Sequence, residues 1–255
     1  MATTVDVEEL EAKVKDMYRH VAEQPHGSYH FELGRSLAEH LGYPASVLDR
    51  IPDASIESFA GVGYFFDLAD LGEGESVIDL GSGSGMDVFF AAAQVGTEGR
   101  VVGIDFTAAQ LEKARGLARD GRFTQVDFRE GRIESLDAED ESFDCVISNG
   151  VINLAPEKDR VFAEAARVLR SGGRLAIADI VSEQQLKESI VCDADLWASC
   201  IGGASQEDAY REAIEAAGLR VEEIKPNPYR FISEQAKNAS GKYGVKSVSL
   251  LARKA

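Results

Sequence analysis

Between residues 76 and 181, short segments rich in β-branched residues alternate with segments whose apolar residues recur at helical spacing. Such alternation is typical of parallel βαβ units, because two parallel strands need a helix-length crossover between them. A further helix and two more strands follow towards the C-terminus. The predicted strands cover residues 76–80, 100–106, 123–131, 143–149, 174–181, 219–224 and 245–253. We therefore expect an α/β fold with a doubly wound, mostly parallel sheet of seven strands whose last two strands pair antiparallel.

The segment that precedes the sheet predicts a helical cap. Its first apolar residues are spaced by three and four, as in an amphipathic helix. Two shorter helices are predicted before residue 50, and residues 51–75 read as a connection. We expect residues 1–65 to form a helical N-terminal cap over a main domain of residues 66–255, with a second cap segment inserted at about 183–204. These two segments are expected to supply the acceptor side of the site, because the loops of the sheet serve a cofactor.

The charge balance limits the possible partners. The chain has 27 Lys and Arg against 44 Asp and Glu, a net charge of −17. Nucleic-acid binding needs a basic surface, and so does docking on an anionic membrane, so we expect a small-molecule acceptor instead. No apolar run approaches the roughly 20 residues that span a bilayer. Three cysteines and no secretory signal favour a reducing cytoplasm, and the sequence leaves the oligomeric state open.

The sequence DLGSGSG at 79–85 follows the first strand and opens a helix. Gly81 and Gly83 allow a tight turn and the close approach of a ligand to the backbone. The dinucleotide fingerprint has a third glycine where this chain has Met86, and Gly85 comes one residue too early. The loop therefore disfavours a pyrophosphate, although a nicotinamide oxidoreductase stays an alternative.

Three further elements lie at the same predicted edge of the sheet. Asp105 is the last residue but one of the second predicted strand, 20 residues after Gly85, where an acid can accept hydrogen bonds from ribose hydroxyls. The sequence GRIE at 131–134 follows the third strand, where it can flank an adenine. FDCVISN at 143–149 ends at the carboxyl edge, where ligands of doubly wound sheets bind. Together with the glycine loop, these elements indicate an adenosine-containing cofactor.

In these elements the chain resembles the class I S-adenosylmethionine-dependent methyltransferases, over about residues 59–220. The resemblance implies a Rossmann-like fold, S-adenosylmethionine (SAM) as cofactor and methyl transfer as the reaction. It also implies the following cofactor contacts: Asp79, Gly81, Ser82 and Gly83 at the methionine end, Asp105 at the ribose, Phe106 and Ile133 on the adenine faces, Arg132 and Glu134 at the adenine edge, and Ser148 and Asn149 near the sulfonium. Because a sulfonium is cationic, a negative cleft suits it.

A narrower resemblance links residues 148–181 and the segment LWASCIGGA at 196–204 to the arsenite methyltransferases. That family holds trivalent arsenic with three cysteine thiolates. The first is expected 17 residues before the glycine loop, where this chain has Val62, and the second where it has Gly150. Only Cys200 matches the third. Three soft thiolates hold a soft ion and one does not, so the resemblance implies the scaffold of the family without most of its arsenic site.

The remaining residues suggest an acceptor that needs little base catalysis. All four histidines lie before residue 41, so a histidine base would have to come from the cap, where Tyr29 and His30 are candidates. A thiol is already partly ionised near neutral pH. We therefore expect methyl transfer to a soft sulfur nucleophile, a thiol or sulfide, with Cys200, Tyr29 and His30 as candidate catalytic residues.

Other readings stay open at this point. The chain could methylate arsenite, or it could bind SAM without turning it over. A catechol-type metal site would need acids after the fourth and fifth predicted strands. Asp179 supplies one, but Asn149 and Gly150 supply no second acid, so we expect no metal.

Overall fold

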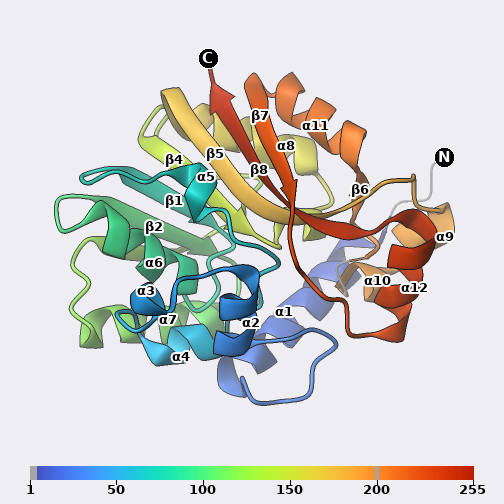
Figure 1. Ribbon diagram of the computed structural model, residues 1–255, viewed down its shortest axis with the longest axis horizontal. Helices are drawn as coiled ribbons and strands as arrows, with labels where there is room; N and C mark the ends of the chain where they lie inside the picture. The colour runs from blue at the N-terminus through green and yellow to red at the C-terminus, as the bar shows by residue number, and fades with distance from the viewer. Residues whose placement is uncertain (1–4, 199–200) are drawn as a thin grey trace.

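The computed structural model describes residues 5–198 and 201–255. One sheet runs through the molecule in the order β3-β2-β1-β4-β5-β8-β7, with the two-residue β6 beside β5 (Figure 1). The strands are β1 Ser76–Leu80, β2 Arg100–Asp105, β3 Val126–Glu130, β4 Phe143–Asn149, β5 Leu169–Ser182, β6 Ser205–Gln206, β7 Leu219–Pro226 and β8 Lys246–Lys254. The five neighbouring strands β3, β2, β1, β4 and β5 pair in parallel. Strand β8 is antiparallel to both β5 and β7. The prediction of a doubly wound, mostly parallel sheet is confirmed.

Helices cover both faces of this sheet, which explains why its central strands are buried and mostly apolar. On one face, α6 (Met86–Val95) and α7 (Ala108–Asp120) pack on Val77 and Val101. On the other, α8 (Lys158–Val168) and α11 (Glu207–Ala216) pack on Ile78 and Val102. Successive residues of a strand therefore enter different cores. The strand order reverses between β1 and β4, so the loops that follow them diverge and leave a crevice at the carboxyl edge.

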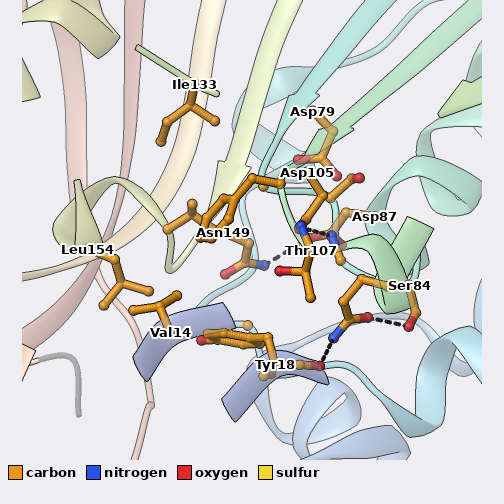
Figure 2. Close-up of a pocket in the computed structure, with 18 of the residues that line it drawn as sticks. Val14, Tyr18, Asp79, Ser84, Asp87, Asp105, Thr107, Ile133, Asn149 and Leu154 are labelled. Atoms are coloured by element: carbon orange, nitrogen blue, oxygen red, sulfur yellow. Dashed lines mark hydrogen bonds between the residues drawn. The ribbon is translucent and has the colours of Figure 1, made fainter. Parts of the chain in front are cut away.

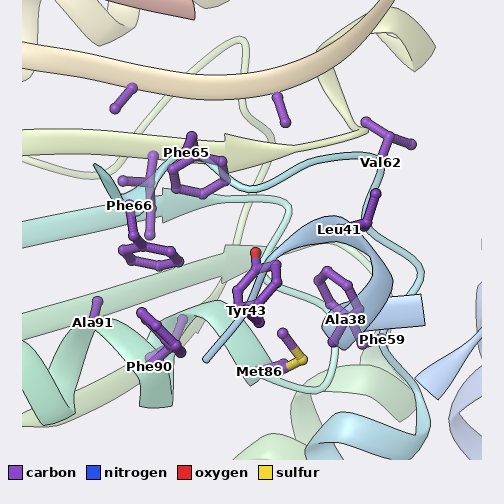
Figure 3. Close-up of a cluster of buried hydrophobic side chains, with 14 of the residues drawn as sticks. Ala38, Leu41, Tyr43, Phe59, Val62, Phe65, Phe66, Met86, Phe90 and Ala91 are labelled. Carbon is purple, nitrogen blue, oxygen red and sulfur yellow. The ribbon is translucent and has the colours of Figure 1, made fainter. Parts of the chain in front are cut away.

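The N-terminal segment forms α1 (Val7–Glu23), α2 (Gly34–Leu41) and α3 (Ala45–Leu48). The predicted connection at 51–75 also contains two short helices, α4 (Asp53–Glu57) and α5 (Phe66–Ala69), each only about one turn long and therefore without a periodic signal. Aromatic rings join this segment to α6 (Figure 3). The ring centroids of Phe66 and Phe90 lie 4.4 Å apart, and those of Tyr43 and Phe90 lie 5.3 Å apart.

The two predicted cap segments meet. Residues 183–204 contain α9 (Glu188–Val191) and α10 (Ala194–Ala198), and Trp197 of α10 packs with Leu10 and Val14 of α1. The strand β4 is followed by a short 3-10 helix, η1 (Ile152–Leu154). No helix within residues 5–198 and 201–255 combines the length and apolarity that crossing a membrane requires.

A longer helix near the C-terminus was also not predicted. The helix α12 (Glu234–Tyr243) begins at Ser233, whose hydroxyl accepts a hydrogen bond from the Ala236 N–H at 3.2 Å. It buries only Ala236, Ala239 and Tyr243. The apolar stripe of this helix is thus made mainly of small residues in a polar sequence, which gives little hydrophobic periodicity.

Candidate functional site

A cavity opens at the carboxyl ends of β1, β2 and β4 and encloses about 1140 Å³, its open mouth included (Figure 2). The glycine loop, the end of β2, residues 132–134 and the end of β4 form its walls, and α1 lies across it. The predicted cofactor residues that line it are Asp79, Gly81, Ser82, Gly83, Asp105, Phe106, Arg132, Ile133, Glu134 and Asn149. The structure therefore brings together side chains from four separate loops, as the topology of a doubly wound sheet requires.

Ser148 is the predicted cofactor residue that does not line this cavity. Its side chain is buried, and its hydroxyl donates a 2.7 Å hydrogen bond to the carbonyl of Leu80. This bond fastens the end of β4 to the end of β1. Ser148 thus stabilises the edge of the sheet that carries the site, without facing the cavity itself.

The glycine loop needs its first glycine for two reasons. Gly81 has a φ of +80°, a region that side chains rarely adopt. A Cβ atom at Gly81 would also lie 2.4 Å from Cγ2 of Val151, so the two loops could not approach each other as they do. Within the described residues, the buried hydroxyl of Ser82 in this loop has no hydrogen-bond partner. A polar ligand in the cavity can satisfy it.

The carboxylate of Asp105 is held in place by the backbone. The N–H of Gly83 donates to one oxygen at 2.9 Å, and the N–H of Thr107 donates to the other at 2.7 Å. Burial raises the pKa of Asp105, and these bonds act in the opposite direction. Each carboxylate oxygen keeps a further lone pair, so Asp105 can still accept hydrogen bonds from the two hydroxyls of a ribose.

Three buried acids line the cavity, and their negative charges repel one another. Burial raises the pKa of Asp79 well above its usual value, and the charges of Asp87 and Asp105 raise it further. Burial also raises the pKa of Asp87 to about 6. A cation in the cavity would relieve both the repulsion and the cost of burial. These residues therefore fit a ligand that carries an ammonium and a sulfonium, as SAM does.

Asn149 connects the cavity to the segment before the sheet. Its Nδ2 donates to Oδ2 of Asp87 at 3.0 Å, while its Oδ1 accepts the N–H of Val62 at 2.8 Å. The hydroxyl of Tyr43 donates to Oδ1 of Asp87 at 2.6 Å. The sequence analysis missed Asp87 and Tyr43. An acid inside the apolar helix MDVFFAAAQV was the available signal for Asp87, whereas Tyr43 had none.

Helix α1 forms part of the cofactor cavity, through Leu10, Glu11, Val14 and Tyr18 (Figure 2). Arg132 binds Glu11 at 2.6 Å, and this hydrogen bond is the main reason that the pKa of Glu11 is lowered. Nε2 of Gln110 donates to the Tyr18 carbonyl at 2.8 Å. The N-terminal segment therefore covers the cofactor cavity.

The predicted catalytic residues lie outside the cofactor cavity or outside the described residues. The hydroxyl of Tyr29 donates to the Gln24 carbonyl at 2.8 Å, within the loop after α1. His30 lines a second, smaller pocket that shares Tyr18 and Ala60 with the cofactor cavity. Cys200 falls in the part of the chain that the structure does not describe, so its role stays a prediction.

Val62 and Gly150, the positions of the two missing thiols, lie in contact. A Cβ atom at Gly150 would lie 3.1 Å from Cγ1 of Val62. The N–H of Gly150 donates to the Ala178 carbonyl at 2.8 Å, and its φ of +71° favours glycine. Two positions 88 residues apart in the sequence therefore face each other beside the cofactor cavity.

Comparison with known proteins agrees with this site. A family model described as a methyltransferase domain matches residues 71–218. The arsenite methyltransferase of Halobacterium salinarum is 40% identical over 226 residues, which cover 88% of this chain and 57% of that protein. The arsenite methyltransferase of Aquipseudomonas alcaligenes is 44% identical over 139 residues, covering 52% of this chain and 40% of that protein. The chain thus spans little more than half the length of such relatives, or less.

Solved structures show the same fold. The arsenic(III) SAM methyltransferase of Chlamydomonas reinhardtii is 32% identical with a TM-score of 0.63, over 87% of this chain and 74% of that one. The geranyl diphosphate C-methyltransferase of Streptomyces coelicolor, which is 18% identical, has a TM-score of 0.68 over 95% of this chain and 98% of that one. Three observations point to the same family: the cavity with its three carboxylates, the family model and these relatives. The chain belongs to the class I SAM-dependent methyltransferases, close to the arsenite methyltransferases, and its cofactor is SAM.

Proposed function

We propose that this chain methylates a small sulfur nucleophile, a thiol or sulfide, rather than arsenite. The contact between Val62 and Gly150 is the observation that carries this proposal. A valine side chain and a glycine stand where the related family needs two thiolates. A single cysteine at position 200 lacks the chelate that holds a thiophilic ion.

When bound, SAM supplies an activated methyl group: the acceptor sulfur forms a bond to that carbon as the sulfonium C–S bond breaks. The residues of the chain act by binding and orientation. With SAM bound, Asp79 and Asp87 would offset the positive charge, Asp105 would hold the ribose, and α1 would cover the cofactor. An acceptor thiol gives its proton to solvent before it reacts, because its thiolate is already populated near neutral pH. No strong base is then required of Tyr29 or His30.

Arsenite methylation is the second candidate. It is supported by the names of the relatives at 40 and 44% identity and by the presence of Cys200. The chain covers at most 57% of those two proteins, however, and its two altered positions lie together beside the cofactor cavity. Binding of SAM without turnover is the third candidate.

We also propose that the protein resides in a reducing cytoplasm, because three cysteines are too few for a framework of disulfides.

The acceptor can be tested with purified protein and SAM. Sulfide, small thiols, selenite, arsenite, phenols and amines are supplied in separate reactions, and the demethylated cofactor is measured. Sulfur acceptors should react. Robust turnover of arsenite would contradict the argument from Val62 and Gly150, and turnover of only phenols or amines would contradict the argument from the absent base. SAM binding with no turnover of any acceptor would favour a binding protein.

A gain-of-function variant sharpens this test. Val62→Cys restores one thiol of the related family at a buried position of ordinary backbone. If the arsenic site is missing only its thiols, this variant should bind arsenite more tightly than the parent protein, as measured by calorimetry. Val62→Ser is the matched control, because it changes size and polarity similarly without supplying a soft ligand.

A further inference from the structure

The second pocket lies beside the cofactor cavity. Tyr18 and Ala60 line both hollows, and Val62 lines the second one. The hollow measures about 340 Å³ when its open mouth and the adjoining solvent are included. It therefore lies beside the cofactor cavity, with Tyr18 and Ala60 between the two, and it borders the contact between Val62 and Gly150.

Aromatic rings form most of its wall. Tyr18 and Phe31 stack with their centroids 6.2 Å apart, and Tyr229 and Phe231 meet edge to face at 5.2 Å. The first pair comes from α1 and the loop after it. The second pair comes from the segment between β7 and α12, far away in the sequence. Apolar side chains from both ends of the chain thus converge on one small space.

The segment after β7 directs these rings inward by strand-like alternation. Tyr229 and Phe231 are partly buried, whereas Pro228, Arg230 and Ile232 between and beside them are exposed. The one charged residue of this stretch, Arg230, is therefore on the solvent side. The alternation keeps charge out of the pocket.

The charges of the two hollows differ. The cofactor cavity contains three buried carboxylates, whereas no lysine, arginine, aspartate or glutamate lines the second pocket within residues 5–198 and 201–255. His30 is its titratable residue besides the tyrosines. A charged ligand here would lose its hydration without gaining an ionic partner, which is costly. An uncharged, apolar ligand would gain from the aromatic surface.

We propose that this pocket binds the methyl acceptor, and that the acceptor is an uncharged thiol with an apolar aryl or alkyl group. This inference rests on the proposed function and narrows its substrate class. The apolar group occupies the space between Phe31, Tyr229 and Phe231, and the sulfur points past Ala60 towards the cofactor. The new S–CH₃ bond forms as the sulfonium bond breaks, and the thiol proton goes to solvent.

Acceptor preference tests this directly. Phenylmethanethiol and 2-mercaptoethanesulfonate serve as an apolar and an anionic thiol, at matched concentrations of their thiolates. The apolar thiol should give a kcat/KM at least about tenfold higher, the scale that an apolar pocket can discriminate. Equal or better use of the anionic thiol would overturn the proposal, as would preference for an amine, which aromatic walls can also attract as a cation.

A variant series locates the pocket. Phe231→Ala should raise the KM for phenylmethanethiol about tenfold and leave the KM for SAM within about twofold, and Phe231→Leu should restore most of the loss. Ile232→Ala is the matched control, because Ile232 neighbours Phe231 but is 39% exposed. An unchanged acceptor KM in Phe231→Ala would contradict the proposal.

A binding measurement separates this inference from the proposed function. The thioether product, benzyl methyl sulfide, is titrated into protein saturated with S-adenosylhomocysteine, and the heat is recorded. Binding that Phe231→Ala abolishes and Ile232→Ala preserves supports the pocket even if no thiol is methylated, an outcome that would refute only the proposed function. Thiol methylation without binding of this thioether, or without an effect of Phe231→Ala, refutes only the pocket.

Discussion

The hydroxyl of Tyr43 donates a 2.6 Å hydrogen bond to a carboxylate oxygen of Asp87 at the floor of the cofactor cavity. The amide of Asn149 binds the other carboxylate oxygen at 3.0 Å. Three parts of the chain meet in this arrangement: the segment before the sheet, the start of α6 and the end of β4. The arrangement fixes the position of one of the buried carboxylates that line the cofactor cavity.

Replacing Tyr43 by Phe should therefore weaken cofactor binding. Without the phenol, the buried carboxylate of Asp87 loses a donor, so its pKa rises further and less of it is charged at neutral pH. We expect a loss of about 1–3 kcal/mol in SAM affinity and protein stability combined. Calorimetry and thermal unfolding measure the two parts. Tyr64→Phe is the control, because the ring of Tyr64 packs on Tyr43 but its hydroxyl does not bind Asp87; an equal loss in both variants would contradict this account.

The pKa of Asp87 also predicts how pH changes the effect of the cofactor. In the folded protein this pKa is about 6, above the usual value of about 3.9 for an unfolded chain. Between these values the folded state binds more protons, so the contribution of Asp87 to stability falls as pH rises towards 6 and stays low above it. A cationic ligand offsets that loss. The rise in Tm caused by SAM should thus be larger at about pH 8 than at about pH 5.

Two variants distinguish the source of this pH dependence. Asp87→Asn removes the titrating group and should flatten the difference between the two pH values. Asp179→Asn removes another buried acid whose pKa is about 6, but Asp179 binds Tyr210 and does not line the cofactor cavity. The cofactor effect in Asp179→Asn should keep the pH dependence of the parent protein. Loss of that dependence in both variants would show that Asp87 is not its source.

Asp105 lines the cofactor cavity, and its carboxylate should contribute to SAM affinity by accepting hydrogen bonds from the ribose. Asp105→Ala is expected to weaken SAM binding by about 1.5–3 kcal/mol, the cost of losing hydrogen bonds to a charged group. Asp127→Ala, at a half-exposed carboxylate on the neighbouring strand β3, should have no effect on affinity. Titration calorimetry measures the SAM affinity of both variants. Unchanged affinity in Asp105→Ala would place the ribose elsewhere.

The contacts of α1 predict that the cofactor stabilises this helix. Leu10, Val14 and Tyr18 line the cavity, while Arg132 and Gln110 attach α1 to the loops below. Amides of α1 should therefore exchange hydrogen more slowly when SAM is bound. The amides of α12, which does not line the cofactor cavity, provide the internal comparison. Equal slowing in both helices would indicate general stabilisation and contradict a specific cover.

The strands and the cofactor loops could be predicted from the sequence because their signals are local. β-branched runs ending in DLGSGSG, Asp105 and Asn149 mark one edge of a parallel sheet, and the structure brings these residues together there. Asp87 and Tyr43 could not be paired in this way, because 44 residues separate them and only packing brings them into contact.

The second pocket could not be predicted for a similar reason. Tyr229 and Phe231 lie in a segment without regular structure, and α12 beside it has an apolar stripe of mostly small residues. Tyr229 and Phe231 line the same pocket as Tyr18 because β7 brings the chain back to this side of the molecule. Val62 and Gly150 were identified by resemblance to a family, and their contact emerged only from the fold.

The methylated product tests the central claim most directly. Protein and SAM are incubated with phenylmethanethiol in one reaction and with arsenite in another, because free thiols bind arsenite, and the products are identified by mass spectrometry. The account predicts benzyl methyl sulfide in the first reaction, formed with an equal amount of S-adenosylhomocysteine, and no methylated arsenic in the second. Methylated arsenic without any thioether would contradict it.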